Sequence, residues 1–265
     1  MNKNNNFYQG LVIKEEPNGE KAKLIHVLTS DGIFLMKAPG AKNLKSSTHS
    51  AVQLFTLSEF SAVKGKGYYM TITGAVTKNN FFGLRNNVLS YALACYISSV
   101  AEKVSVNDST CSDILRLVLN CFYALSDLNY PADIVKPIFE IKLASVCGFS
   151  PELSVCPHCE KLTDGDVFDF FTSGIICKEC EKNFGISIKS NRFFKLDRLS
   201  VSILNYISTC EIKKIFKVKS VLENTENYVK ASAFRCFSER LICHMLEYEP
   251  KTLSFYNQLI RSIKK

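Results

Sequence analysis

The sequence predicts an α+β protein, in which a small five-stranded barrel is followed by an all-helical domain that carries a four-cysteine zinc module. Three observations indicate this fold class. Short runs of β-branched and aromatic residues fill the start of the chain, the apolar spacing lengthens to about 3.6 residues after Phe81-Phe82-Gly83, and two C-x-x-C pairs interrupt the helical part. The expected domains are residues 1–80, and residues 81–265 with the zinc-binding insertion at about 150–185.

Five strands are expected in the first domain. Turn-forming sequences such as Pro17-Asn18-Gly19 and Asp31-Gly32 separate them. Five short strands fit a closed or nearly closed barrel, and the oligonucleotide-binding (OB) fold is the five-stranded version that accepts nucleic acid. The expected strands are Tyr8–Lys14, Lys23–Thr29, Ile33–Ala38, Val52–Val63 and Tyr68–Thr77.

Helices are expected through most of the second domain. Apolar residues recur there at i, i+3, i+4 and i+7, with Pro131 near one start and Gly148 at one stop. The expected helices are Asn87–Val104, Ser112–Leu128, Ala132–Cys147, Leu199–Cys210, Val221–Leu246 and Thr252–Ile263.

The two cysteine pairs are Cys156/Cys159 and Cys177/Cys180, separated by seventeen residues. This spacing is typical of a structural zinc site, in which four thiolates complete the tetrahedral shell of one Zn²⁺ and leave no position for substrate. Phe168–Phe171 and Gly174–Ile176 read as a hairpin that brings the pairs together. The region is too small to bury its own core, so metal binding and folding should be coupled.

The cysteines admit three other interpretations. Cys156-Pro157-His158-Cys159 alone resembles an oxidising thiol-disulfide site, although it follows helices rather than a βαβ unit. His158-Cys159-Glu160 matches part of a nucleobase deaminase signature, but Ile176 stands where the required proline would precede the second pair. His158 could also replace one cysteine as a ligand.

Composition narrows the function classes. The 265-residue chain has no run of eighteen apolar residues and no apolar segment behind its first residues, so neither a membrane span nor a signal peptide is expected. Its eleven cysteines are odd in number and mostly isolated among aliphatic residues, which fits a reducing cytosol. The net charge of +8 is concentrated at the two ends, +5 in residues 1–80 and +7 in residues 191–265, whereas residues 150–190 carry −3. Such ends suit a polyanion, or serve solubility alone.

No catalytic motif emerges, and the four histidines are scattered, so the sequence predicts no enzyme. Basic residues of the barrel are the candidate DNA ligands. Barrels of this kind pair a cationic groove with aromatic stacking platforms, here Tyr68 and Tyr69. The candidates are first Lys37, Lys42 and Lys45, then Lys14, Lys64, Lys66 and Arg85. A second lysine cluster, which is more typical of a solvated face than of a nucleic-acid contact, comprises Lys213, Lys214, Lys217 and Lys219.

Taken in order, these features resemble the RecO family of bacterial recombination mediators. The similarity is carried by the opening strands around Gly10–Lys14 and Leu24–Thr29, by the basic loop Lys37-Ala38-Pro39-Gly40-Ala41-Lys42, and by Phe139–Leu143 with Gly148–Leu153 leading into the cysteine pairs. It covers nearly the whole chain, and the last segment is the most specific.

The resemblance implies a DNA repair protein of the bacterial cytoplasm, associated with the nucleoid. It implies binding and annealing of single-stranded DNA, association with RecR, contact with the acidic C-terminal tail of the single-strand-binding protein, and indirect help in loading RecA. Whether double-stranded DNA also binds is left open. The alternatives are a protein-interaction adaptor whose barrel binds a protein partner, and a nucleic-acid-modifying zinc enzyme.

Overall fold

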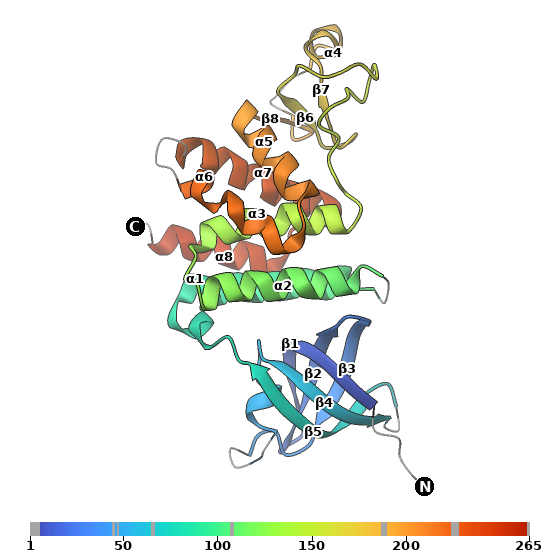
Figure 1. Ribbon diagram of the computed structural model, residues 1–265, viewed down its shortest axis with the longest axis vertical. Coiled ribbons are helices and arrows are strands. Elements are labelled where there is room, and N and C mark those ends of the chain that lie inside the picture. Colours follow the sequence, from blue (N-terminus) through green and yellow to red (C-terminus); the bar gives the residue numbers. More distant parts are fainter. Residues whose placement is uncertain are drawn as a thin grey trace. The chain divides into compact units, whose positions relative to one another are not determined.

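The computed structural model describes residues 6–43, 46, 48–64, 67–106, 109–186, 190–223 and 228–263, with the backbone alone at 228–233 (Figure 1). The chain forms two compact units, the first comprising Met1–Tyr130 and Pro250–Lys265 and the second Pro131–Glu249. The last barrel strand ends at Asn79, and the first unit continues beyond it into helices. The boundary expected at residue 80 separates the barrel from the helices by proposed function, and it stays a prediction.

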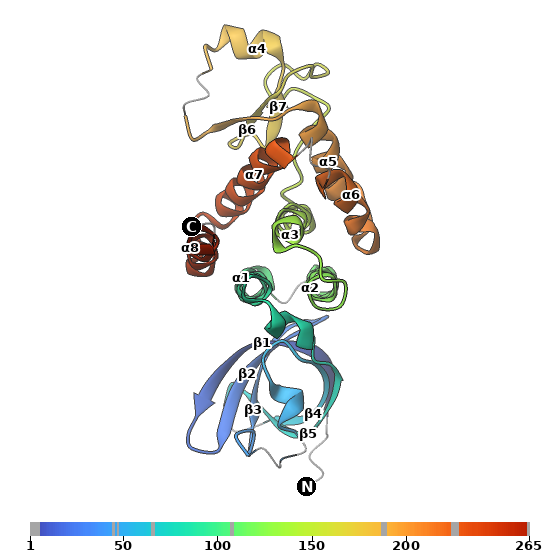
Figure 2. The same ribbon diagram turned by 90° about the vertical axis from the view of Figure 1, so that its left-hand side faces the viewer.

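Five strands close into a barrel, as the sequence predicts. Their order around the barrel is β1-β2-β3-β5-β4, with β4 also pairing with β1. All pairs are antiparallel except β3 with β5, whose short parallel contact joins Met36 to Met70 and Lys37 to Thr71. Figure 2 shows the closed barrel. The strands are β1 (Asn6–Asn18), β2 (Ala22–Thr29), β3 (Gly32–Ala38), β4 (Leu57–Lys64) and β5 (Met70–Asn79).

The barrel encloses a small apolar core that follows from the alternation of its strands. Val12, Ile25, Met36 and Phe60 come from four different strands and are fully buried together. As alternation across a strand requires, Ile25, Met36 and Phe60 have sequence neighbours that are partly buried or exposed. Val12 is different, because its neighbours Leu11 and Ile13 are buried as well. The core is therefore specified mainly by strand register, and in β1 by the buried apolar run Leu11–Ile13 as well.

The expected strand at Val52–Val63 is wrong at its start, because β4 begins only at Leu57. A short 3₁₀ helix, η1 (Ser50–Val52), comes first. Phe55 then takes a left-handed backbone conformation (φ 66°), and its N–H donates to the Val12 carbonyl at 2.8 Å. The Phe55 ring is fully buried and packs edge-on against Phe122, with ring centroids 5.2 Å apart. Packing against a helix thus overrides the local β propensity.

Three helices and a 3₁₀ turn complete the first unit. Asn87 caps α1, because its side-chain oxygen accepts from the N–H groups of Leu89 and Ser90. The Ser99 and Thr252 hydroxyls meet at 2.6 Å and join α1 to α8, which lie side by side in Figure 2. The elements are η2 (Phe82–Asn86), α1 (Val88–Val104), α2 (Cys111–Ser126) and α8 (Lys251–Ile263).

The helices of the second unit are held by a buried polar network. Glu140 of α3 is completely buried, accepts from Lys136 at 2.8 Å and accepts from the Ser238 hydroxyl of α7 at 2.7 Å. The expected helix over 221–246 is described as α6 and α7, between which residues 224–227 lie outside the described part. The elements are α3 (Ala132–Val146), α5 (Arg198–Thr209), η3 (Ile212–Val218), α6 (Lys219–Glu223) and α7 (Tyr228–Leu246).

The cysteine module forms a small sheet in the second unit. The expected hairpin is confirmed as β6 (Val167–Asp169) and β7 (Gly174–Ile176), and β8 (Phe193–Lys195) adds a third strand beside β6. The short helix α4 (Lys178–Asn183) follows β7. None of the described helices combines the length and the apolar character that crossing a membrane requires.

The aromatic contact between barrel and helices yields a stability prediction. Phe122→Ala removes the ring against which Phe55 and Phe81 pack, so we expect a loss of about 3–5 kcal/mol in the free energy of unfolding. Urea unfolding followed by circular dichroism measures it. Phe255→Ala on α8, where the ring is largely exposed, is the matched control and should change the free energy by less than about 0.5 kcal/mol. Equal effects of the two substitutions would contradict the assigned packing.

Candidate metal centre and nucleic-acid surface

The four cysteines of the two pairs converge on one point. Each cysteine pair forms a knuckle, Cys156/Cys159 the first and Cys177/Cys180 the second. The β6–β7 hairpin pairs Val167 with Ile176, so the chain that enters the second knuckle runs back to the first. The Sγ atoms of Cys156, Cys159, Cys177 and Cys180 all lie within 4.8 Å of one another. A spacing read from sequence is therefore a cluster in space.

The geometry of this cluster fits a tetrahedral ion. Zn–S bonds of about 2.3 Å require sulfur–sulfur separations of about 3.8 Å around a tetrahedron. The Sγ atoms of Cys159 and Cys177 are 3.6 Å apart, and three of the four cysteines are buried. The residues present therefore fit a divalent, thiophilic ion, which would close the module and offer no open coordination position.

Backbone N–H groups favour the thiolate form at the first knuckle. The Cys177 N–H points at the Cys156 sulfur at 3.3 Å. Burial raises the pKa of Cys156, but hydrogen bonds from backbone N–H groups, that of Cys177 first, lower it more, to about 6. In contrast, burial and then the neighbouring thiols raise the pKa of Cys180 to about 12. Four adjacent thiols cannot all ionise unless a cation compensates the negative charge.

His158 does not belong to the sulfur cluster. In the described part of the chain, the potential metal-binding group that includes the knuckles consists of the four cysteines alone. The His158 ring lies against Phe184, with centroids 5.1 Å apart, and its Nε2 is 3.7 Å from a carboxylate oxygen of Asp169. His158 therefore packs beside the first knuckle and is not a fifth candidate ligand.

A buried ion pair that sequence reasoning missed supports the module. Asp169 on β6 is completely buried and accepts two hydrogen bonds from Arg192, at 2.8 Å from Nε and 2.7 Å from Nη2. Burial raises the pKa of this carboxyl, but Arg192 together with hydrogen bonds from the Phe171 N–H and the Thr172 hydroxyl lowers it more, so the net shift is downward. The pair ties the segment before β8 to the hairpin. Neither residue lies in a motif, and nothing in the sequence relates two positions 23 apart.

The barrel places two of the predicted DNA ligands at one end of β5. Register pairs Lys37 with Thr71 and Lys64 with Met70. The Lys37 ammonium lies 5.9 Å from the ring centroid of Tyr69, and the adjacent Tyr68 side chain is fully exposed. Neither lysine forms an ion pair within the described residues. The fold thus unites cations and aromatic rings that are distant in sequence.

The other predicted DNA ligands differ in their surroundings. Lys42 Nζ donates to the Gly19 carbonyl at 2.7 Å, which holds the loop after β3 against the β1–β2 turn. Lys14 is paired with Glu16 at 2.9 Å. Arg85 donates to the Leu54 carbonyl at 2.8 Å. Lys45 and Lys66 lie outside the described residues.

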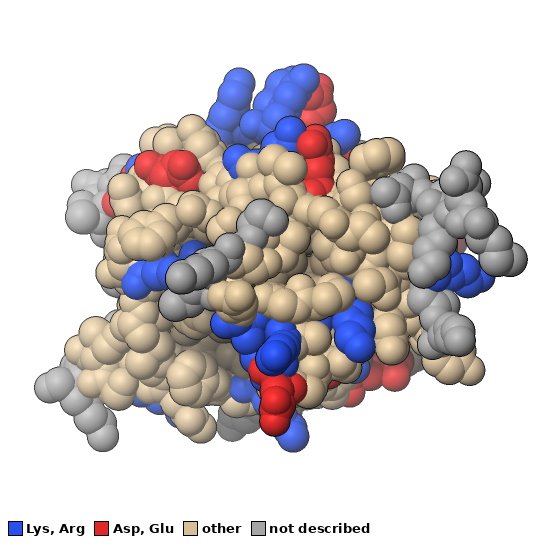
Figure 3. All heavy atoms as spheres, turned by 90° about the horizontal axis from the view of Figure 1, so that it is seen from below, with Lys and Arg blue, Asp and Glu red and all other residues tan. Residues whose placement is uncertain are grey.

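Charge on the visible face of the molecule is not one continuous patch. Figure 3, seen from below Figure 1, shows lysine and arginine side chains in separate groups, some of which include acidic side chains. In the second lysine cluster, Lys213 and Lys214 both pair with Glu211, and Lys219 pairs with Glu223. The two glutamates therefore offset about half of the charge of the four lysines, and the segment keeps a net charge of +2.

Comparison with known proteins identifies the family. The model described as Recombination protein O N terminal matches residues 5–81, and that described as Recombination protein O C terminal matches residues 85–227. The chain belongs to the RecO family. The resemblance inferred from the sequence is confirmed.

Curated RecO relatives align over most of the chain. DNA repair protein RecO of Dehalococcoides mccartyi strain 195 is 28% identical over 261 residues, which is 96% of each chain. That of Acetivibrio thermocellus is 29% identical over 235 residues, 88% of this chain and 90% of the relative. That of Caldanaerobacter subterraneus is 25% identical, with 95% and 97% covered. RecO proteins act in recombination and DNA repair, as these names state.

The thiol pKa values predict how metal affinity depends on pH. A metal must displace the proton that Cys180, with its pKa of about 12, holds at neutral pH. Affinity should therefore fall at least about tenfold for each unit of decreasing pH near neutrality. It should fall more steeply below pH 6, where the Cys156 thiolate of the metal-free protein also gains a proton. Competition with a chelator of known affinity, at several pH values, measures this dependence.

The matched control is Cys236→Ser, because Cys236 is an exposed thiol on α7 outside the cluster. It should leave the curve unchanged, whereas Cys180→Ser should lower the affinity at every pH. A curve that stays flat between pH 8 and pH 5 would mean that the thiols do not hold the metal.

Proposed function

We propose that this protein is a non-catalytic recombination mediator. It binds single-stranded DNA through the barrel, promotes annealing of complementary strands, and helps load RecA onto DNA coated with the single-strand-binding protein. The observation that carries the proposal is the near full-length RecO match, joined to a five-stranded barrel of the OB type. In this proposal residues 1–80 are the DNA-binding domain and residues 81–265 the helical domain with its zinc insertion.

The start of β5 is the proposed contact with DNA. Lys37 and Lys64 flank this strand, and Tyr68 and Tyr69 precede it. Each lysine can neutralise one phosphate, and an aromatic ring that stacks on a base contributes about 1–3 kcal/mol. Lys42, in the loop after β3, adds to the cationic surface. Lys45 and Lys66, which lie outside the described residues, belong to the proposed set by their place in the sequence alone. Lys14 and Arg85, which already have protein partners, are the weaker ligands of the set.

Annealing requires that the phosphate charge of both strands be neutralised, and it makes or breaks no covalent bond. Two strands repel each other through their phosphates, and positive side chains that screen both strands leave base pairing to supply specificity. The basic ends of the chain, +5 in residues 1–80 and +7 in residues 191–265, suit this task. The proposal therefore assigns no catalytic residue.

The proposed partners follow from family membership. RecR and the acidic C-terminal tail of the single-strand-binding protein would bind directly, and RecA would be affected indirectly. The proposed cofactor is one structural Zn²⁺ on Cys156, Cys159, Cys177 and Cys180, which would hold the insertion rigid and take no part in a reaction. The proposed location is the bacterial cytoplasm, at the nucleoid.

Replacing Lys37, Lys42 and Lys45 together by alanine tests the DNA site. Each lost phosphate contact removes about 0.7 from the slope of log K against log salt for a single strand, so the slope should become shallower by about 2. Fluorescence anisotropy of a labelled oligonucleotide, titrated at several salt concentrations, measures K. Mutation of positions without phosphate contacts leaves the slope unchanged.

The control replaces Lys213, Lys214 and Lys219, three lysines already paired with Glu211 or Glu223. Their loss should change the slope by less than one contact. If this triple variant, rather than the barrel variant, flattens the slope, the DNA site lies on the helical domain. If neither strand nor duplex binds, the barrel is a protein-interaction module, and turnover of a nucleic-acid substrate would instead identify an enzyme.

Elemental analysis tests the identity of the metal. Protein purified without added metal should contain about one zinc per chain, since four cysteine ligands satisfy one tetrahedral ion. Cys156→Ser combined with Cys159→Ser should abolish the zinc and lower the stability of the module, whereas Cys236→Ser should do neither. A metal-free protein with undiminished thermal stability would refute the zinc assignment.

A further inference from the structure

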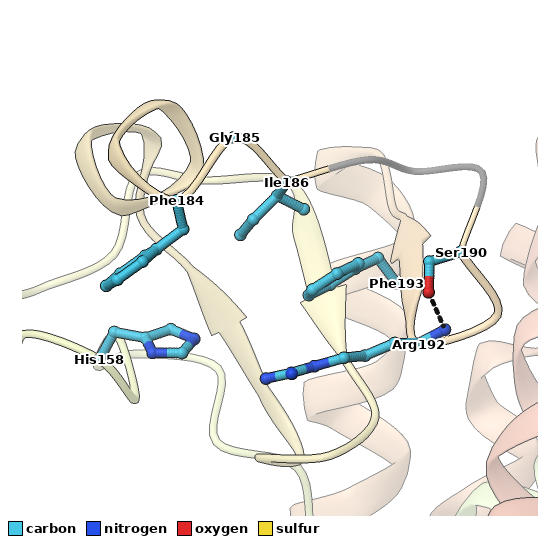
Figure 4. A pocket seen from close by; sticks show the side chains of 7 residues that line it. All are labelled: His158, Phe184, Gly185, Ile186, Ser190, Arg192 and Phe193. Atoms are coloured by element: carbon cyan, nitrogen blue, oxygen red, sulfur yellow. Dashed lines mark hydrogen bonds between the residues drawn. The ribbon is translucent and has the colours of Figure 1, made fainter.

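A cavity of about 310 Å³ adjoins the metal centre. Figure 4 shows its walls: Phe184 and Ile186 face it from the segment after α4, His158 from the first knuckle, and Arg192 and Phe193 from the segment that enters β8. This volume lies near the lower end of the range for small-molecule sites, about 300–1,000 Å³. It suits one planar group better than a length of polymer.

Flat surfaces dominate the lining. The rings of His158 and Phe184 are 5.1 Å apart, inclined at 43°. The Arg192 guanidinium lies 5.1 Å from the Phe193 ring centroid, and in Figure 4 it extends beneath the cavity toward His158. Phe184 is 63% exposed, so a large apolar ring is left available for contact. Aromatic rings and a guanidinium plane are the surfaces on which unstacked bases pack.

The electrostatics of the site favour a neutral ligand. Arg192 is bound to the buried carboxylate of Asp169 through Nε and Nη2, so its charge is largely cancelled. Residues 150–190 carry −3, and four thiolates around Zn²⁺ would add two negative charges, which disfavours an anion. A cation would find no acceptor on Arg192, because a guanidinium carries only N–H donors. The remaining Arg192 nitrogen, Nη1, has no hydrogen-bond partner in the described part of the chain, so it can donate to a neutral acceptor.

We propose that this cavity binds one unstacked nucleobase of a single-stranded nucleic acid. A base is neutral, planar and rimmed with carbonyl or ring-nitrogen acceptors, so it can pack on Phe184 and accept from Arg192 Nη1. Its phosphates stay outside, because the module repels them. The inference rests on the proposed function for the presence of a single strand, and adds a second, uncharged mode of contact.

The metal centre supports the cavity. Ile186 and Phe193 pack against the cluster of Cys156, Ile176, Cys177 and Cys180, and both line the cavity. Loss of the metal should therefore disorganise the nucleobase site, although no ligand touches the metal. This relation gives the four cysteines an indirect role in binding.

Phe184→Trp tests the inference directly, because the chain contains no tryptophan. The larger ring retains stacking and becomes the only indole, whose fluorescence a stacked base quenches. We expect oligothymidylate to quench it, with saturation at the same concentration as the anisotropy of the same labelled strand. Free thymidine monophosphate should have no effect at those concentrations. Quenching by the mononucleotide alone, or anisotropy that saturates without quenching, would overturn the inference, whereas absence of both signals would refute the proposed function.

Phe184→Ala supplies an independent measurement. Affinity for the single strand should fall about 5- to 150-fold, the range for one lost base stack, while the slope of log K against log salt stays unchanged. The control is Leu162→Ala, because Leu162 is an exposed apolar residue of the same module that does not line the cavity. Metal content equal to that of the parent protein shows that each variant is folded. Unchanged affinity for Phe184→Ala, or an equal loss for both variants, would overturn the inference.

Discussion

Mutual repulsion among four crowded thiolates is the constraint on which the cysteine module depends. Two unit charges 4 Å apart repel by about 4 kcal/mol at an effective dielectric constant of 20, and here all four sulfurs lie within 4.8 Å of one another. A divalent ion converts this repulsion into attraction. A bound ion would thereby hold the second knuckle against the first, where Ile186 and Phe193 pack against the sulfur cluster. The Asp169–Arg192 pair has its bidentate geometry because the hairpin is in place.

A different constraint shapes the first unit. The barrel does not end as a free module at β5, because the segment before β4 inserts Phe55 between the barrel and the helices, against Tyr91 and Phe122. The left-handed conformation of Phe55 is costly for a residue with a side chain, at about 1–3 kcal/mol, and persists because its buried ring and its hydrogen bond to Val12 offset that cost. The Leu54 carbonyl beside it accepts from Arg85. The segment before β4 is thereby packed against the helices. The lysines and tyrosines near the start of β5 take no part in this packing and can contact a ligand.

The parts of the structure that depend on local periodicity could be predicted from the sequence. The strand runs, five of the six helices, the hairpin and the cysteine cluster follow from alternation, apolar spacing and the C-x-x-C pairs. The start of β4 could not be predicted, because the apolar sequence from Val52 favours a strand. The rings that explain why Phe55 turns inward, Tyr91 and Phe122, are distant from it in sequence. The ion pair of Asp169 and Arg192 was equally hidden, since an isolated aspartate and arginine carry no periodic signal. Long-range contacts select among conformations that local sequence leaves nearly equal.

A mediator of annealing faces two opposed requirements. It must hold strands whose phosphates repel each other, yet leave the bases free to pair. Contacts to phosphate satisfy both requirements, because they bind the sugar-phosphate backbone of the DNA and leave the base edges exposed. Extensive stacking would meet only the first, since each base held on an aromatic ring is withdrawn from pairing. The composition agrees with this balance, because the two ends of the chain carry 24 Lys/Arg. Among the described residues, rings placed next to cations, such as Tyr69 near Lys37 and Phe184, which shares a cavity with Arg192, are far apart in sequence. A site for a single base can position one strand without withdrawing the rest of it from pairing.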